Sequence, residues 1–204
     1  MKKLLLTGFQ PFDSEKVNPA LELVKRLRGQ QVGDFLITTE EIPVVRFQSL
    51  EVIAKAINRE QPQAIIAVGQ AGGRPFITVE RVGINVDDFR IPDNAGNQPI
   101  DEPIVQDAPP AYFATLPIKR MVQAMRMAGV PAAVSNTAGT FVCNHVLYGL
   151  LHELAQRGLH IPAGFVHIPY LPEQIAPHKG LESTQSTMAL ETVEKGFRAM
   201  IGIL

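Results

Sequence analysis

The chain alternates short, continuous apolar runs with longer segments of helical periodicity, and this alternation restricts the fold more than any other feature. The clearest run covers residues 64–69, which read as a strand covered on both faces. Further strands are predicted at 4–7, 34–42, 76–91, 132–136 and 164–169, and helices at 19–28, 47–58, 117–128 and 183–200, with another from Cys143 onward. Strands that alternate with helices indicate a three-layer α/β/α sandwich with a mostly parallel, mixed central sheet.

One stretch departs from the alternation. Residues 92–115 are rich in proline, aspartate and asparagine, and we expect a long irregular excursion that lies at the mouth of a site or at a subunit contact. The length and the 46% of hydrophobic residues suffice for one well-buried core, so residues 1–204 are predicted to form a single domain.

Charge and composition narrow the range of partners. The formal net charge of −1 gives no electrostatic reason to expect nucleic acid or an anionic membrane. The single cysteine excludes an internal disulfide and a multi-cysteine zinc site, which fits a reducing cytosol. The apolar start ends at Gly8, too early for a signal peptide, and no stretch is long enough to span a bilayer. We expect a soluble, cytoplasmic protein that acts on small molecules or peptides.

The single cysteine, Cys143, stands where an apolar, turn-rich run gives way to a helical pattern. It is therefore predicted to open a helix. The unpaired N–H groups and positive dipole end of a helix N-terminus favour a thiolate and can stabilise an oxyanion. Cys143 is a candidate nucleophile, and the alternative is a small buried hydrophobic side chain.

A nucleophilic thiol needs a base, and a catalytic histidine needs a group that orients it. His167 is the polar exception at the end of an apolar strand, whereas His145 lies two residues after Cys143 and points away from it. Glu80 is a polar exception among apolar strand residues. These three, Glu80, Cys143 and His167, are the candidate catalytic set.

His167 and Glu80 also have simpler interpretations. His167 alone would more often be a core histidine with its hydrogen bonds satisfied. Glu80 could instead form a charge pair with Arg81 or Arg74.

Several motifs resemble those of a known family. The residues that carry the resemblance are Thr7-Gly8-Phe9-Gln10-Pro11-Phe12 with Asn18-Pro19, the run 69–85 around Glu80, the run 135–144 around Cys143, and Phe165-Val166-His167-Ile168-Pro169. They are similar to the motifs of pyroglutamyl peptidase I, also called pyrrolidone-carboxylate peptidase, of the bacterial cysteine type. The resemblance extends over nearly the whole chain and places Glu80, Cys143 and His167 on the family's catalytic residues.

The resemblance implies a phosphorylase- or hydrolase-like scaffold and a cytoplasmic cysteine exopeptidase that uses neither cofactor nor metal. It implies removal of N-terminal pyroglutamate from peptides through a thioester acyl-enzyme, and a homo-oligomer, either tetramer or dimer. Cys143 would attack the carbonyl, His167 would transfer the proton, and Glu80 would orient the imidazole. Backbone N–H groups at Cys143, with one near Arg90 as the family suggests, would hold the oxyanion.

Recognition of a five-membered lactam needs flat apolar walls and a few polar groups that match an amide. Phenylalanines can supply the walls, with Gln70 or Asn18 as the polar partners, although the phenylalanines could equally be core residues. The predicted substrate-binding residues are Phe9, Phe12, Asn18, Gln70, Arg90, Phe141 and Val142.

Two other function classes stay open from the residues alone. A nucleoside-phosphorylase-like enzyme would need a phosphate cradle, for which only residues 69–74 qualify. A non-catalytic binder of pyroglutamyl N-termini would use the same pocket without releasing an amine.

Overall fold

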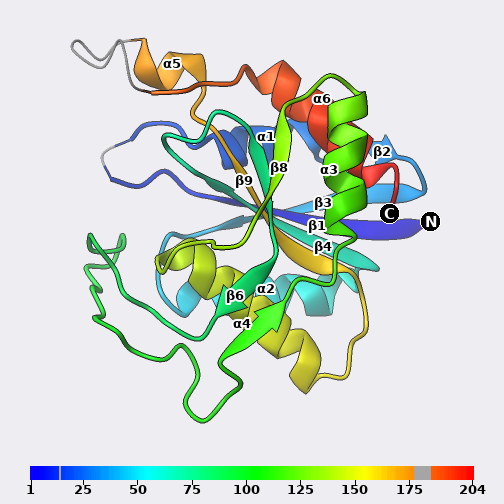
Figure 1. Cartoon of the computed structure of the whole chain (residues 1–204). Coiled ribbons are helices and arrows are strands. Elements are labelled where there is room, and N and C mark those ends of the chain that lie inside the picture. Colours follow the sequence, from blue (N-terminus) through cyan, green and yellow to red (C-terminus); the bar gives the residue numbers. More distant parts are fainter. Residues whose placement is uncertain (14, 177–184) are drawn as a thin grey trace.

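The computed structural model describes residues 1–13, 15–176 and 185–204 (Figure 1). A seven-stranded sheet with the order β2-β3-β1-β4-β9-β5-β8 forms its centre. These strands are β1 (Lys2–Phe9), β2 (Gln31–Val32), β3 (Phe35–Ile42), β4 (Ala64–Gln70), β5 (Ile77–Glu80), β8 (Ala132–Ser135) and β9 (Ala163–Ile168). The predicted strand of residues 64–69 is thus β4, near the middle of the sheet, with every residue before Gln70 buried.

The strand directions confirm a mixed, mostly parallel sheet. Strands β3, β1, β4 and β9 are parallel to one another, and β8 is parallel to β5. Strand β5 is antiparallel to β9, with Thr78 opposite His167. Because of this reversal, the carboxyl ends of β4 and β9 lie on the same side of the sheet as the amino end of β5.

Helices cover both faces of the sheet, which confirms the three-layer architecture. Figure 1 shows α1 (Pro19–Leu27), α3 (Ile118–Met127) and α6 (Leu190–Ile201) on one side, and α2 (Gln48–Glu60) and α4 (Val142–Gln156) on the other. Each side has its own cluster of buried apolar residues against the sheet. The short helix α5 (Pro172–Ile175) follows β9. The assignment of residues 1–204 to one domain stays a prediction.

Local signals explain where the first helix begins. Asn18 caps α1 by accepting a hydrogen bond from the backbone N–H of Ala20, and Pro19 occupies the first helical position, where no N–H is needed. The predicted last helix of residues 183–200 is wrong over residues 185–189, which are not helical, while residues 183 and 184 lie outside the described ranges. Helix α6 begins only at Leu190, because the preceding segment runs along Tyr170, whose carbonyl accepts the N–H of Met188.

The predicted single extended segment of residues 76–91 is also wrong. It divides at Arg81 into β5 and β6 (Val82–Ile84), and β6 pairs with β7 (Ala111–Phe113) in a separate two-stranded sheet. Strand β6 packs closely against α4 here, since a Cβ added to Gly83 would lie 2.8 Å from the Tyr148 nitrogen. Residues 92–115 are irregular as predicted, except for β7.

Within the described ranges, no helix combines the length and the apolar character needed to cross a membrane.

Candidate active site

Glu80 and His167 form a buried hydrogen bond across the β5–β9 pair. Glu80 Oε1 accepts from His167 Nδ1 at 2.8 Å, and both side chains are almost completely shielded from solvent. Because a carboxylate oxygen accepts this bond, the proton of a neutral imidazole lies on Nδ1 and Nε2 is an acceptor. His167 therefore has the tautomer that a general base for a thiol requires.

Cys143 approaches the same part of the sheet from α4, where it is the second helical residue. A Cβ added to Gly69 would lie 3.1 Å from Cys143 Sγ and 2.7 Å from Phe165 Cζ, so the sulfur and this ring pack against the end of β4. Gly69 is the register partner of His167, and the Phe165 and His167 rings are 4.8 Å apart. The fold thus brings the thiol to the sheet face that carries the imidazole.

The first turn of α4 presents backbone donors at this point. Phe141 is the N-cap residue and provides no side-chain cap among the described residues, while its carbonyl accepts the N–H of His145. The preceding N–H groups of the helix can therefore face an oxyanion. Thr140 and Asp88 exchange two hydrogen bonds, of 2.8 and 3.1 Å, which join the loop of Arg90 to the start of α4.

The expected bias of Cys143 toward thiolate is wrong for the resting site. Burial raises the pKa of the Cys143 thiol to about 12, and the negative charge of Glu80 adds to the shift. Arg74 opposes it without reversing it. Desolvation of the sulfur therefore disfavours the thiolate, and the resting thiol is neutral near pH 7.

The pKa values of His167 and Glu80 are both lowered, which leaves the imidazole neutral and the carboxylate charged. Burial lowers the pKa of His167 below 6.5, although its hydrogen bond to Glu80 works in the opposite direction. Burial alone would raise the pKa of Glu80, but the hydrogen bonds from His167 and Arg74 work in the opposite direction, and the net shift is downward. Near neutral pH the site consequently holds a thiol, a neutral imidazole and a carboxylate.

The charge pair considered as an alternative role for Glu80 coexists with its bond to His167. Arg74 Nη1 donates to Glu80 Oε1 at 2.6 Å and to Thr78 Oγ1 at 2.6 Å. Arg81 is directed elsewhere, because its Nε donates to Asn136 Oδ1. Glu80 Oε1 thus accepts hydrogen bonds from both His167 and Arg74, so the role of Glu80 as the orienting group and its charge pair do not exclude each other.

A narrow apolar slot lies beside Cys143. It is lined by Phe9, Phe12, Asn18, Val44, Gln70, Phe141, Val142 and Cys143, and leaves about 10 Å³ for the centre of a water molecule. Six of the seven predicted substrate-binding residues therefore meet at one place. The Asn18 amide is already engaged there, since it donates to Gln10 O and caps α1.

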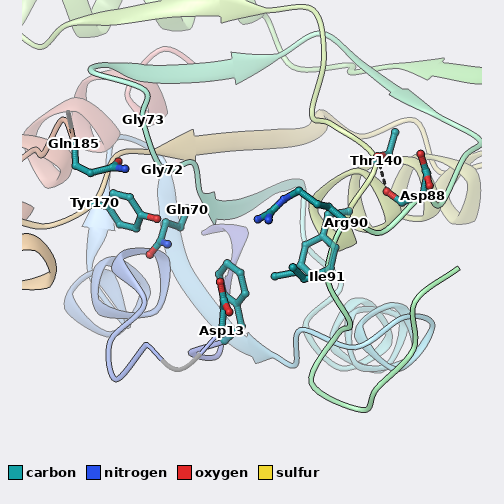
Figure 2. Close-up of a pocket in the computed structure, with 12 residues that line it drawn as sticks. Asp13, Gln70, Gly72, Gly73, Asp88, Arg90, Ile91, Thr140, Tyr170 and Gln185 are labelled. Atoms are coloured by element: carbon teal, nitrogen blue, oxygen red, sulfur yellow. Dashed lines mark hydrogen bonds between the residues drawn. The ribbon is translucent and has the colours of Figure 1, made fainter. Parts of the chain in front are cut away.

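A wider pocket of about 420 Å³ opens outside the slot and shares Phe12, Gln70 and Phe141 with it. Figure 2 shows Arg90 and Ile91 on one side of this pocket, opposite Gln70 and Tyr170. Arg90, the seventh predicted residue, thus faces the approach to the slot and not the slot itself.

The residues of the site that were missed as binding or positioning residues include Val44, Tyr170 and Gln174. Val44 completes the apolar lining of the slot, Tyr170 lines the wider pocket, and Gln174 contacts Gln70. Only Tyr170 has a sequence signal, because it follows the strand that carries His167. Among the described residues, no group of three or more His, Cys, Asp or Glu side chains could hold a metal ion.

His145 belongs to a different cluster, as its position on the helix predicts. Its Nδ1 lies 2.8 Å from Asp87 Oδ2, and its Nε2 accepts the N–H of Phe47 at 2.9 Å. Arg46 Nε donates to the same Asp87 oxygen. This network joins α2, α4 and the loop before Arg90, so it supports the frame of the site.

Comparison with known proteins identifies the family of the chain. Residues 2–204 match the family model described as pyroglutamyl peptidase. The chain is 55% identical over 202 residues to the pyrrolidone-carboxylate peptidase of Cupriavidus taiwanensis, covering 98% of this chain and 92% of that protein. It is 56% identical over 194 residues to that of Enterobacter sp. (strain 638), covering 95% and 88%.

Solved structures give the same result. The crystal structure of Bacillus amyloliquefaciens pyroglutamyl peptidase I superimposes with a TM-score of 0.94 at 50% identity, covering 99% of this chain and 96% of that one. The pyrrolidone carboxyl peptidase of Thermococcus litoralis gives a TM-score of 0.95 at 37% identity, covering 100% and 93%. The chain therefore belongs to the pyroglutamyl peptidase family of cysteine peptidases.

Proposed function

We propose that this enzyme removes pyroglutamate from the N-terminus of peptides, with Cys143 as nucleophile, His167 as general base and Glu80 as the group that orients His167. The observation that carries the proposal is the buried 2.8 Å bond between His167 Nδ1 and Glu80 Oε1, on the sheet face where Cys143 Sγ packs. Family membership supports the reaction, and the arrangement of these residues supports their roles.

The reaction starts from neutral partners. Cys143 Sγ attacks the carbonyl carbon that follows the lactam ring, and its proton passes to His167 Nε2 as the C–S bond forms. The N–H groups of the first turn of α4 stabilise the oxyanion. The C–N bond then breaks, and His167 returns the proton to the leaving amine.

The second half of the reaction releases the acid. Water attacks the thioester while His167 accepts one of its protons, the C–S bond breaks, and the proton goes back to Cys143 Sγ. Throughout both halves, Glu80 holds Nδ1–H and stabilises the imidazolium that forms transiently.

The lactam ring binds in the slot beside Cys143. The present volume of about 10 Å³ admits roughly one water, so the ring enters only when Phe12 and Phe141 move apart. Both rings are half-buried, with centroids 6.1 Å apart, and they separate the slot from the wider pocket that receives the rest of the peptide.

We also propose that the enzyme is cytoplasmic and works as a homo-oligomer, a dimer or a tetramer. Its net charge of −1 supports neither nucleic acid nor a membrane as partner. Large apolar side chains exposed on the isolated chain support subunit contacts; they include Ile100, Phe113 and Met127.

The geometry does not favour the nucleoside-phosphorylase alternative. Arg74, the only arginine in the glycine-rich run 69–74, is held by Glu80, Thr78 and the carbonyl of Thr137. It is therefore not available as a phosphate ligand. A non-catalytic binder of pyroglutamyl N-termini would not need the buried His167–Glu80 pair, so the geometry does not favour that alternative either.

The direct test is release of a chromogenic amine from a pyroglutamyl amide by the wild-type enzyme and by Cys143→Ala. We expect turnover by the wild type and none above background by the variant, with an unchanged melting temperature because the substitution is small. Substantial amidase activity in folded Cys143→Ala would disprove the thiol mechanism.

A further inference from the structure

Gln174 on α5 makes hydrogen bonds whose directions are dictated by the backbone. Its Oε1 accepts the N–H of Leu171 at 2.9 Å, and its Nε2 donates to the carbonyl of Val17 at 3.3 Å. An N–H can only donate and a carbonyl can only accept, so the two ends of the Gln174 amide cannot be exchanged. Gln174 is also buried, with 4% of its surface exposed, which holds it in this position.

The fixed amide of Gln174 determines the orientation of the next one. Gln174 Nε2 also lies 2.8 Å from Gln70 Oε1, and a nitrogen donor at this point requires an acceptor. The Gln70 oxygen is therefore the end that faces Gln174. The Gln70 nitrogen is left on the side of the cavity, and Gln70 lines both the slot and the wider pocket.

From this chain of contacts we infer that Gln174 is a positioning residue that presents the N–H₂ group of Gln70 to the substrate. The inference rests on the proposed function and deepens it, because an N–H₂ group selects an acceptor, the lactam carbonyl. An N-terminal proline has no ring carbonyl and places an ammonium donor in the same slot. The orientation of Gln70 therefore contributes to selection of pyroglutamyl over prolyl N-termini.

Two replacements of Gln174 test this role. In Gln174→Glu the end near Gln70 becomes an acceptor, so Gln70 turns its nitrogen toward Glu and its oxygen toward the slot. In Gln174→Met neither end is specified, and Gln70 populates both orientations. Glu173→Met, at an exposed position on the same short helix, is the matched control.

The measurements are kcat and KM for a pyroglutamyl amide, and inhibition by 2-pyrrolidone, which carries the lactam carbonyl. A buried donor replaced by an acceptor weakens binding by about 10- to 100-fold. We expect KM and the 2-pyrrolidone Ki to rise by this amount in Gln174→Glu and by less in Gln174→Met. We expect kcat to fall much less, and Glu173→Met to match the wild type.

A double-mutant cycle separates positioning from loss of stability. If Gln174 acts through Gln70, adding Gln174→Met to Gln70→Leu leaves the 2-pyrrolidone Ki where Gln70→Leu alone puts it. Additive effects in the cycle, or a fall in melting temperature and kcat with an unchanged Ki, would overturn the inference. Wild-type enzyme that does not hydrolyse the pyroglutamyl amide would instead refute the proposed function.

Discussion

Replacing Glu80 by Gln tests whether Glu80 orients His167 or only forms an ion pair with Arg74. The substitution keeps the size of the side chain but removes the charge that both partners contact through Oε1, at 2.8 and 2.6 Å. An amide at this position can also present a donor to His167 and thereby favour the other tautomer, with the proton on Nε2. A base in that tautomer cannot accept the thiol proton, and the serine-protease precedent indicates a fall in kcat of up to about 10⁴-fold.

The structure also predicts a loss of stability that an exposed charge pair would not produce. Hydrogen bonds to a buried charge contribute about 1.5–3 kcal/mol each, compared with about 0–1 kcal/mol for an exposed ion pair. Glu80 has no exposed surface, whereas 29% of the Arg74 side chain is exposed and can be resolvated. We expect Glu80→Gln to reduce the free energy of unfolding by about 2–3 kcal/mol, a fall in melting temperature of roughly 4–12 °C.

Arg74→Gln is the matched control, because it removes the arginine contact and keeps the His167 contact. It should lose a comparable amount of stability but far less kcat. The assay compares kcat from amine release with the melting temperature from circular dichroism for both variants. Equal kcat losses in the two variants, or near-normal kcat in folded Glu80→Gln, would refute the assignment of Glu80 as the orienting group.

Further predictions concern the sulfur, its proton and the slot. Gly69→Ala should reduce the free energy of unfolding by about 1–3 kcal/mol and lower kcat, because its Cβ would lie 2.7 Å from Phe165 Cζ and 3.1 Å from Cys143 Sγ. An unchanged kcat would contradict this packing. The acid limb of kcat/KM should lie below pH 6.5, because the lowered pKa of His167 keeps it neutral above that pH; an acid limb above pH 7 would be contrary evidence. Alkylation of resting Cys143 by iodoacetamide should keep rising above pH 9, because its pKa is raised to about 12, whereas a plateau near pH 7 would indicate a preformed thiolate. Glutamyl amides should be poor substrates, because their ammonium would enter an apolar slot, and rates equal to those of pyroglutamyl amides would exclude that slot model.

The parts of the site that depend on local pattern could be predicted from the sequence. Cys143 at a helix start follows from helical periodicity, and His167 and Glu80 are polar exceptions in apolar strands. Their mutual placement could not be derived from the rule that sites form at the carboxyl ends of parallel strands. Strand β5 runs against β9, so Glu80 reaches His167 sideways across the sheet.

Other features depend on tertiary contacts that leave no local signal. Gln174 is one glutamine in a short helix, and its importance lies in a contact with Gln70, 104 positions earlier. Burial raises the pKa of the Cys143 thiol, and this burial comes from tertiary packing that a helix-start pattern does not reveal. Helix α6 begins late because the segment before it pairs with Tyr170.

The central claim is that catalysis proceeds through a pyroglutamyl thioester on Cys143. Mixing the wild-type enzyme with a pyroglutamyl ester or amide, quenching with acid during turnover and measuring the intact and peptide masses tests it directly. The account predicts a mass increase of one pyroglutamyl group on the peptide that contains Cys143, absent after treatment with iodoacetamide and absent in Cys143→Ala. Turnover with an activated ester that leaves Cys143 unmodified at every quench time, or an acyl group found on another residue, would contradict it.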